Sequence, residues 1–226
     1  MEKNNAGLIR LLEGFVTEKR KNLFSSVLRK RTRYITVVLE DIYQPQNASA
    51  VLRTCDCFGI QDVHIIENKN EYRLNPDVTL GSEKWLTLKR HNDKGQNSLT
   101  AVSALKKSGY RIIATMPEGN ISLENFDLNK GKTALCFGTE LTGLSGEIAD
   151  ASDEQLFIPM HGFTESFNIS VSAAIILHHL TTKLRNSTIK WELTDEEILE
   201  LKLNWLKKSV KNSEMIEKKH GSGGMI

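Results

Sequence analysis

The sequence predicts an α/β protein with a mostly parallel sheet that has helices on both faces. Short apolar runs rich in β-branched residues alternate with longer stretches of helical periodicity. The runs at 34–40 and 133–138 are mainly apolar, as expected for strands that are covered on both faces. Three of the runs are followed directly by polar clusters, and ligands of such sheets bind beyond the carboxyl ends of the strands.

The predicted elements alternate along the middle of the chain. We expect strands at residues 34–40, 62–67, 85–90, 110–116, 133–138 and 154–160, and helices at 47–59, 96–108 and 168–185. Gly59 and Gly109 stand at the ends of two of these helices, where glycine adopts a left-handed conformation with least strain.

Helical segments without strands lie at both ends of the chain. Residues 6–29 have the apolar spacing of an amphipathic helix, and a second such stretch begins with Thr194-Asp195-Glu196-Glu197, which resembles a capping box. We therefore expect three parts: a basic helical N-terminal extension at residues 1–33, an α/β domain at 34–188, and a helical C-terminal extension with a flexible tail at 189–226.

Positive charge gathers at the two ends. Residues 1–33 contain nine Lys and Arg against three Glu, although the whole chain has a formal net charge of only +2. Six further lysines lie between residues 202 and 219. Basic ends suit a polyanionic partner such as RNA, although solvated helix faces explain the same pattern.

Composition points to a cytoplasmic protein without a membrane partner. No apolar run approaches the roughly 20 residues that span a bilayer. The N-terminal residues lack the apolar core of a secretory signal. The chain has only three cysteines, which fits a reducing compartment.

Common nucleotide and metal motifs are missing. Leu144-Ser145 stand where a phosphate loop requires Lys-Ser/Thr, and no GxGxxG follows a strand. Cys55 and Cys57 have no second ligand pair. The adjacent His178 and His179 point to different sides of their helix, so we expect no metal site.

The first polar cluster lies at residues 39–60. Asn47 stands where a strand gives way to a helix, and capping that helix is its simplest role. Arg53 follows six residues later, about 240° around an ideal helix. The two side chains can act together only if a loop or a bend brings them to one place.

The other two clusters follow the last two predicted strands. Glu140 stands between Gly138 and Gly143, which indicates the rim of a pocket, although a turn or cap residue would fit the same pattern. Ser166 and Asn168 stand at the entrance of an apolar helix, where capping is again the simpler interpretation.

Together these clusters resemble a known family. Asn47 through Arg53, the loop FGTELTGLS at 137–145 and the stretch IPMHGFTESFNISVSAAIIL at 158–177 resemble, in the same order, the three motifs of the SpoU family of RNA ribose 2′-O-methyltransferases, within the SPOUT superfamily. The resemblance covers about residues 34–185. The sequence departs from the common pattern at Phe167, where leucine is frequent, and at residues 161–164.

The resemblance implies a SPOUT-type sheet whose C-terminal part forms a trefoil knot, in a homodimer with its active site at the subunit interface. It also implies S-adenosylmethionine as the cofactor, bound inside the knot. The positions that match the cofactor-lining places of the family are Thr115, Gly138, Ile158, Met160 and Phe167.

The resemblance extends to the branch that methylates guanosine 18 of tRNA, because those enzymes also have short helical extensions at both ends. It implies catalytic roles for Arg53, Asn47, Glu140, Ser166 and Asn168. The matching arginine is proposed to activate the 2′-hydroxyl, but a guanidinium with a pKa above about 12 rarely gives up a proton. Holding a phosphate and stabilising the developing alkoxide is an equally economical role. A ribosomal-RNA 2′-O-methyltransferase and a non-catalytic RNA-binding protein of the same fold are the alternatives.

Overall fold

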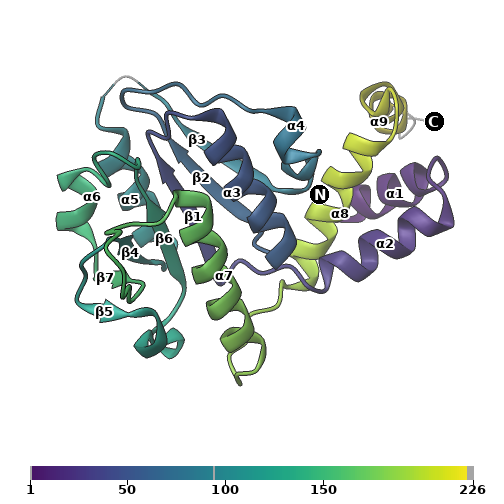
Figure 1. Cartoon of the computed structure of the whole chain (residues 1–226). Coiled ribbons are helices and arrows are strands. Elements are labelled where there is room, and N and C mark those ends of the chain that lie inside the picture. The colour runs from purple at the N-terminus through teal and green to yellow at the C-terminus, as the bar shows by residue number, and fades with distance from the viewer. Residues whose placement is uncertain (1, 94, 223–226) are drawn as a thin grey trace. The chain divides into compact units, whose positions relative to one another are not determined.

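The computed structural model describes residues 2–93 and 95–222. The chain divides into two compact units, one formed by residues 32–191 and the other by the two ends of the chain, residues 1–31 and 192–226 (Figure 1). The end of the predicted flexible tail, residues 223–226, lies outside the described residues. None of the helices in the described parts combines the length and the apolar character that a membrane-spanning helix needs.

The larger unit is built on a parallel sheet with the strand order β3-β2-β1-β6-β4-β7-β5, and every strand pair in it is parallel. The strands are β1 (Ile35–Glu40), β2 (Asp62–Ile66), β3 (Thr87–His91), β4 (Arg111–Thr115), β5 (Ile121–Ser122), β6 (Thr133–Phe137) and β7 (Glu154–Phe157). The predicted α/β class is therefore confirmed. The two-residue strand β5 was not predicted.

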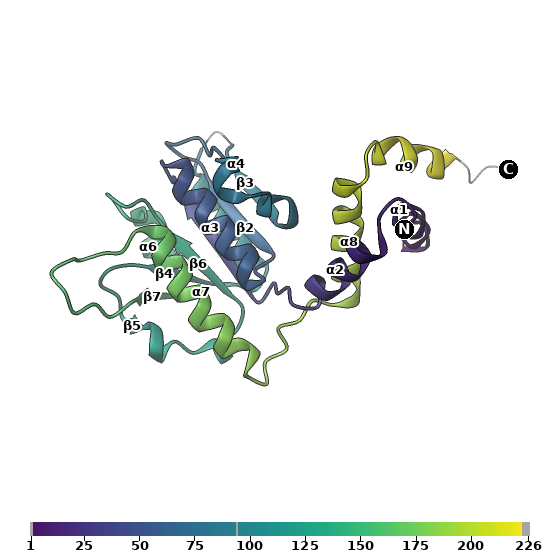
Figure 2. The ribbon, with the colours of Figure 1, turned by 45° about the vertical axis from the view of Figure 1, so that its right-hand side comes forward.

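Helices cover both faces of this sheet. Figures 1 and 2 show α3 (Pro45–Phe58) and α7 (Ile169–Arg185) on one face, and α5 (Asn97–Lys107) and α6 (Gly146–Ala151) on the other. Side chains of β1 alternate between the two cores, because Val37 and Leu39 pack with α3 and α7 whereas Val38 packs with α5 and α6. Short helical turns complete the unit: α4 (Pro76–Thr79), η1 (Ser82–Trp85), η2 (Leu123–Asn125) and η3 (Leu128–Lys130).

Strand β7 is inserted between β4 and β5, which follow one another in the sequence. Leu156 is in register with Thr115 of β4 on one side and Ile121 of β5 on the other. The segment that joins β4 to β5 crosses β7 closely, since a Cβ atom added at Gly119 would lie 2.4 Å from the carbonyl oxygen of Gln155. Only glycine fits at this crossing.

The smaller unit contains α1 (Glu2–Glu13), α2 (Glu18–Leu28), α8 (Asp195–Ser209) and α9 (Ser213–Ser222). The single helix predicted at residues 6–29 is wrong, because the chain turns after Glu13 and starts a new helix whose N-cap is Thr17. Glycine at position 14 and a capping threonine three residues later favour this break over continuation. The Phe24 and Trp205 rings pack edge to face with centroids 5.4 Å apart, joining α2 to α8.

Candidate active site

The last two polar clusters meet at a pocket beyond the carboxyl ends of β4, β6 and β7. It has a volume of about 360 Å³. All five residues expected to bind a cofactor line it: Thr115, Gly138, Ile158, Met160 and Phe167. The parallel sheet brings these five residues together from three separate strand ends.

One wall of the pocket is a tight loop that follows β6. The backbone N–H groups of Thr139 and Gly143 each donate to the other residue's carbonyl oxygen at 3.0 Å. Gly143 has a φ of 67°, which glycine adopts without strain. A Cβ atom at Gly138 would lie 2.1 Å from the carbonyl group of Gly143, so the loop closes only with glycine at that position.

A buried carboxylate fixes the far end of this loop. Glu40 is 2% exposed and accepts hydrogen bonds from the backbone N–H of Ser145 at 2.7 Å, from the Ser145 hydroxyl at 2.7 Å and from the Ser98 hydroxyl at 2.5 Å. Burial, with a smaller contribution from the Glu40 charge, raises the pKa of Cys136. Sequence reasoning missed Glu40. The available signal was a charged residue at the end of an otherwise apolar strand.

Three of the predicted catalytic residues form one hydrogen-bonded cluster. The Asn168 side-chain N–H₂ group donates to Oδ1 of Asn47 at 3.2 Å and to the carboxylate of Glu140. Its oxygen accepts from the backbone N–H of Ser170 at 2.8 Å and from the Ser170 hydroxyl at 2.6 Å, which caps α7. Asn168 therefore both begins the helix and joins the first polar cluster to the second.

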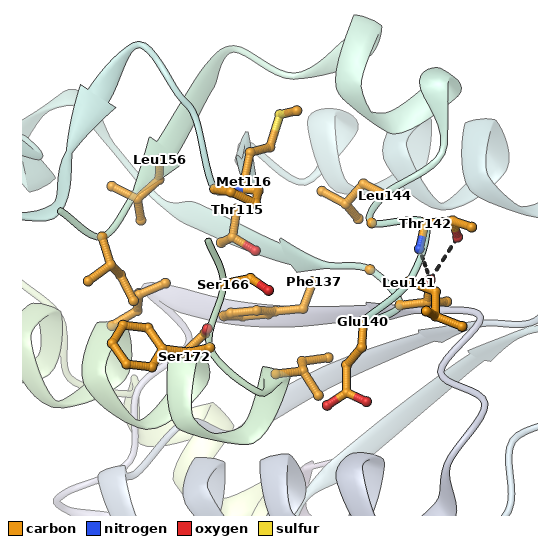
Figure 3. A pocket seen from close by; sticks show the side chains of 18 of the residues that line it. Thr115, Met116, Phe137, Glu140, Leu141, Thr142, Leu144, Leu156, Ser166 and Ser172 are labelled. Atoms are coloured by element: carbon orange, nitrogen blue, oxygen red, sulfur yellow. Dashed lines mark hydrogen bonds between the residues drawn. The ribbon is translucent and has the colours of Figure 1, made fainter. Parts of the chain in front are cut away.

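The residues that line the pocket form two opposite walls. Figure 3 shows Thr115, Met116 and Leu144 on one side, with Ser166 and Glu140 on the other. Ser166 lines the pocket, as its predicted role requires. Met116 and Leu144 were not predicted, although each directly follows a strand or a glycine turn, which is a usable signal.

A second cavity, of about 260 Å³, adjoins the first. Residues 138–142 and Ile169 line both, whereas Asn47 and Tyr43 line the second but not the first. Glu140 lines both cavities and Asn47 lines the second, so the cluster of Asn47, Glu140 and Asn168 lies beside the loop that the two cavities share.

The structure does not bring Arg53 to this cluster within one chain. Helix α3 is continuous from Pro45 to Phe58, so Arg53 lies about 9 Å along the helix axis from Asn47 and on a different side. Its side chain is exposed, and it lines neither of these two cavities. Helix α3, which is described over its whole length, has no bend that would let Asn47 and Arg53 act together within one chain.

The apolar pocket can hold a ligand with a flat or flexible apolar body. Ile158, Met160 and Leu144 supply apolar walls, while Glu140 and Ser166 place polar groups at the edge. Small-molecule sites usually combine mainly apolar walls with a few polar groups that set orientation. Within residues 2–93 and 95–222, no three His, Cys, Asp or Glu side chains lie where they could share a metal ion.

Fold and site together define a parallel α/β protein with a ligand pocket at the carboxyl ends of its central strands. Residues 34–178 match the model of the SpoU rRNA Methylase family. The chain therefore belongs to the SpoU methylase family.

Relatives and a solved structure agree with this family. The chain is 47% identical over 210 residues to a tRNA (guanosine(18)-2′-O)-methyltransferase of Borreliella burgdorferi, covering 92% of this chain and 94% of that protein. A protein of the same name from Aquifex aeolicus is 30% identical over 199 residues, covering 86% and 92%. The crystal structure of the A. aeolicus TrmH/SpoU tRNA modifying enzyme matches with a TM-score of 0.75 and 28% identity, over 86% of this chain and 98% of that one.

Proposed function

We propose that this protein transfers a methyl group to the ribose 2′-hydroxyl of guanosine 18 in tRNA. The observation that carries the proposal is the cluster of Asn47, Glu140 and Asn168 beside the loop that the two cavities share. Family membership supplies the class of chemistry. The two relatives named for this reaction match 92% and 86% of the chain, more than the residues 34–178 that the family model covers, which supports tRNA as the substrate.

The proposed methyl donor is S-adenosylmethionine, bound in the 360 Å³ pocket. When bound, it supplies a methyl group that a sulfonium centre has already activated. Ile158, Met160 and Leu144 would pack against its adenine ring, and Thr115, Gly138 and Phe167 complete the lining. The pocket fits this molecule because mainly apolar walls suit the ring and the polar edge suits its charged end.

The protein's part in the reaction is alignment and removal of the hydroxyl proton. Asn47 orients the ribose in the second cavity, and Asn168, which donates hydrogen bonds to both Asn47 and Glu140, holds the Glu140 carboxylate beside it. Ser166 positions the substrate or the cofactor at the shared edge. Arg53 either accepts the hydroxyl proton or binds a phosphate and stabilises the alkoxide, in which case the proton passes to that phosphate or to solvent. The high pKa of a guanidinium favours the second role.

The position of Arg53 supports a homodimer. Its side chain is exposed and lines neither the cofactor pocket nor the second cavity of its own chain, so a catalytic role for it fits the site of a second copy. Exposed apolar side chains lie at the start of α7 and just before it, with Val171 at 42% and Phe167 at 43% exposure. Covering such side chains is a usual role of a subunit interface.

The proposal includes a trefoil knot in the 32–191 unit. Insertion of β7 between β4 and β5, with the close crossing at Gly119, supports this topology. The two ends of the chain, residues 1–33 and 189–226, are proposed to bind tRNA phosphates through exposed basic side chains such as Arg10, Lys19 and Arg29. A cytoplasmic location fits a tRNA substrate, and none of the three cysteines forms a disulfide.

Ribosomal RNA is the second candidate substrate, because the matching family model is described by rRNA methylation. The chemistry and the site residues would be the same. The two full-length relatives favour tRNA over this alternative.

Methyl transfer from labelled S-adenosylmethionine tests the proposal, with unmodified tRNA transcripts and ribosomal RNA as acceptors. We expect label in tRNA at guanosine 18, mapped by cleavage that 2′-O-methylation blocks, and loss of label with Arg53→Ala. Lys107→Ala, which removes an exposed positive charge from the last turn of α5, is the matched control. Label only in ribosomal RNA would select the second candidate, and RNA binding without any label would identify a non-catalytic protein.

A further inference from the structure

A third and larger cavity continues the row formed by the first two. It has a volume of about 590 Å³ and lies between residues 43–46 and 69–73. It shares Tyr43, Gln44 and Asn70 with the second cavity, which in turn shares residues 138–142 with the cofactor pocket. The three cavities therefore adjoin one another, and Asn47 and Glu140 line the middle one.

The third cavity carries an exposed aromatic ring and two cations. Tyr43 is 76% exposed at the border with the second cavity. Lys69 and Arg73 are exposed on the opposite loop. Within the described residues Lys69 has no ion pair, and Arg73 contacts only Glu71, at 3.3 Å with both side chains more than two-thirds exposed. Such an exposed pair is weak, so Arg73 can turn to another anion.

The two loops around this cavity are fixed to each other before any ligand arrives. The Asp41 carboxylate accepts hydrogen bonds from three successive backbone N–H groups, those of Asn68 at 2.7 Å, Lys69 at 2.8 Å and Asn70 at 3.2 Å. The Asn70 side chain donates back to the Asp41 carbonyl oxygen at 2.8 Å. Asp41 itself has a left-handed φ of 53°, a strained conformation that tends to occur at functional sites.

We propose that this cavity is a nucleotide subsite, in which the base of the methylated nucleotide stacks on Tyr43 and an adjacent phosphate binds Lys69 and Arg73. This rests on the proposed function, because a ribose held beside Asn47 and Glu140 in the second cavity places its base and phosphates next to the third. An aromatic ring beside cations is the arrangement that binds unstacked nucleotides. Loops that are already fixed lower the entropic cost of binding.

Steady-state kinetics with a tRNA transcript and saturating S-adenosylmethionine test the subsite in the full-length protein. Stacking of a base on an aromatic side chain contributes about 1–3 kcal/mol, so Tyr43→Ala lowers kcat/KM for tRNA about 5- to 150-fold. Tyr43→Phe keeps the ring and stays within about threefold of the wild type. Lys69→Ala and Arg73→Ala each lower the slope of log affinity against log salt by about 0.7–0.9.

Cofactor affinity, measured by calorimetry, stays unchanged in all four variants, and Lys107→Ala leaves both tRNA kinetics and cofactor affinity unchanged. A Tyr43→Ala variant with kcat/KM within twofold of the wild type overturns the proposal. If Tyr43→Phe lowers kcat/KM as much as Tyr43→Ala does, the effect belongs to the hydroxyl and the proposal is also overturned. A loss of cofactor affinity that parallels the loss of kcat/KM overturns it as well.

A crosslinking experiment separates the subsite from the proposed function. RNA that carries 6-thioguanosine at position 18 should crosslink within residues 43–46 or 69–73, and less so with Tyr43→Ala. If the wild-type protein methylates only ribosomal RNA, the proposed function fails. The kinetics of the same variants with ribosomal RNA then test whether the subsite exists. Crosslinks that map elsewhere reject it.

Discussion

Glu40 holds together three segments that are distant in the sequence. Its carboxylate joins the end of β1 to Ser98 at the start of α5 and to Ser145 at the end of the pocket loop. A buried carboxylate is costly unless hydrogen bonds satisfy it, and here two hydroxyls and one backbone N–H do so. The residue therefore positions the loop that carries Glu140 without touching the cluster itself.

Glu40→Gln should destabilise the protein by about 2–3 kcal/mol, because the amide lacks the charge and turns a donor toward the serines. It should also weaken binding of S-adenosylmethionine, since the loop loses its attachment. Urea unfolding and calorimetry measure the two effects. The control is Glu147→Gln, which changes an exposed carboxylate in the first turn of α6. Equal stability of the two variants would contradict the role given to Glu40.

His64 makes stability depend on pH. Burial, with contributions from Lys89 and His91, lowers the pKa of His64 to about 4, and its ring nitrogen Nδ1 lies 3.0 Å from Nε2 of His91. The unfolded chain takes up a proton below a pH of about 6.5, whereas the folded chain does so only near 4. Stability is thus present above pH 6.5 and is lost as the pH falls toward 4.

Replacing His64 with Gln should make the free energy of unfolding less sensitive to pH by about 1–2 kcal/mol between pH 7 and 5. Urea titrations at pH 7, 6 and 5 measure the difference. His161→Gln, on an exposed loop, should retain the wild-type slope. A wild-type slope in the His64 variant would show that His64 takes up its proton equally well in the folded and unfolded protein, and would contradict its role in the pH dependence.

The sequence predicted the site residues whose proposed chemistry requires a particular side chain. It did not predict the residues that hold these side chains and their loops in place. Asn168 and Glu140 stand beside strand ends in recognisable motifs, so their location was predictable. Glu40 acts through Ser98 and Ser145, which are 58 and 105 residues away in the sequence. Asp41 acts through residues that begin 27 positions away, at Asn68, and only the fold reveals these partners.

At the level of elements, the pocket loop depends on two glycines for different reasons. Gly143 supplies a left-handed φ, while Gly138 makes room for the backbone that returns from Gly143. Gly146, at the start of α6, has open space around it. The same short segment therefore contains a glycine that geometry requires and one that it does not.

Gly138→Ala should displace the loop, lower affinity for S-adenosylmethionine roughly tenfold or more and cost about 1–3 kcal/mol of stability, as overpacking does. Gly146→Ala is the matched control and should change neither quantity by much. Calorimetry and urea unfolding give both numbers. Unaltered cofactor affinity with Gly138→Ala would show that the loop can open without loss of the pocket.

Predicted elements agree with the structure where periodicity or apolar runs are long. The strands 62–67 and 133–138 and the helix 168–185 end within one residue of β2, β6 and α7. The prediction was too long at 154–160, because residues beyond Phe157 leave the sheet to line the pocket. Strand β5 has two residues, too few for any pattern, and it exists because β7 pairs with it.

For the whole molecule, the distribution of charge leads to a prediction about tRNA binding. Changing Arg10, Lys19 and Arg29 together to Gln should weaken tRNA binding uniformly across tRNAs and lower the salt slope by about 2–3, if each contacts a phosphate. Filter binding over a series of salt concentrations measures the slope.

A control with the same change in charge uses Lys106, Lys107 and Lys132, which lie near the amino ends of β4 and β6. That variant should bind tRNA as the wild type does. Equal losses in both triple variants would mean that net charge, not the terminal helices, governs binding.

The order of the strands in the sheet could not be predicted from the sequence pattern. The alternation of strands and helices predicts a parallel sheet, but general connection rules disfavour a strand inserted between two strands that precede it. The packing of Gly119 on the backbone of Gln155 joins positions 36 residues apart, and nothing in the local pattern of either segment signals the other.

The insertion of β7 also constrains the order of events during synthesis. β5 leaves the ribosome more than 30 residues before β7, yet β7 is the strand with which it pairs. At a synthesis rate of about 5–20 residues per second, β5 and one edge of β4 remain unpaired for seconds, until β7 has been made. A nascent chain that stops before residue 154 therefore exposes an open sheet edge, a target for chaperones that the finished protein no longer presents.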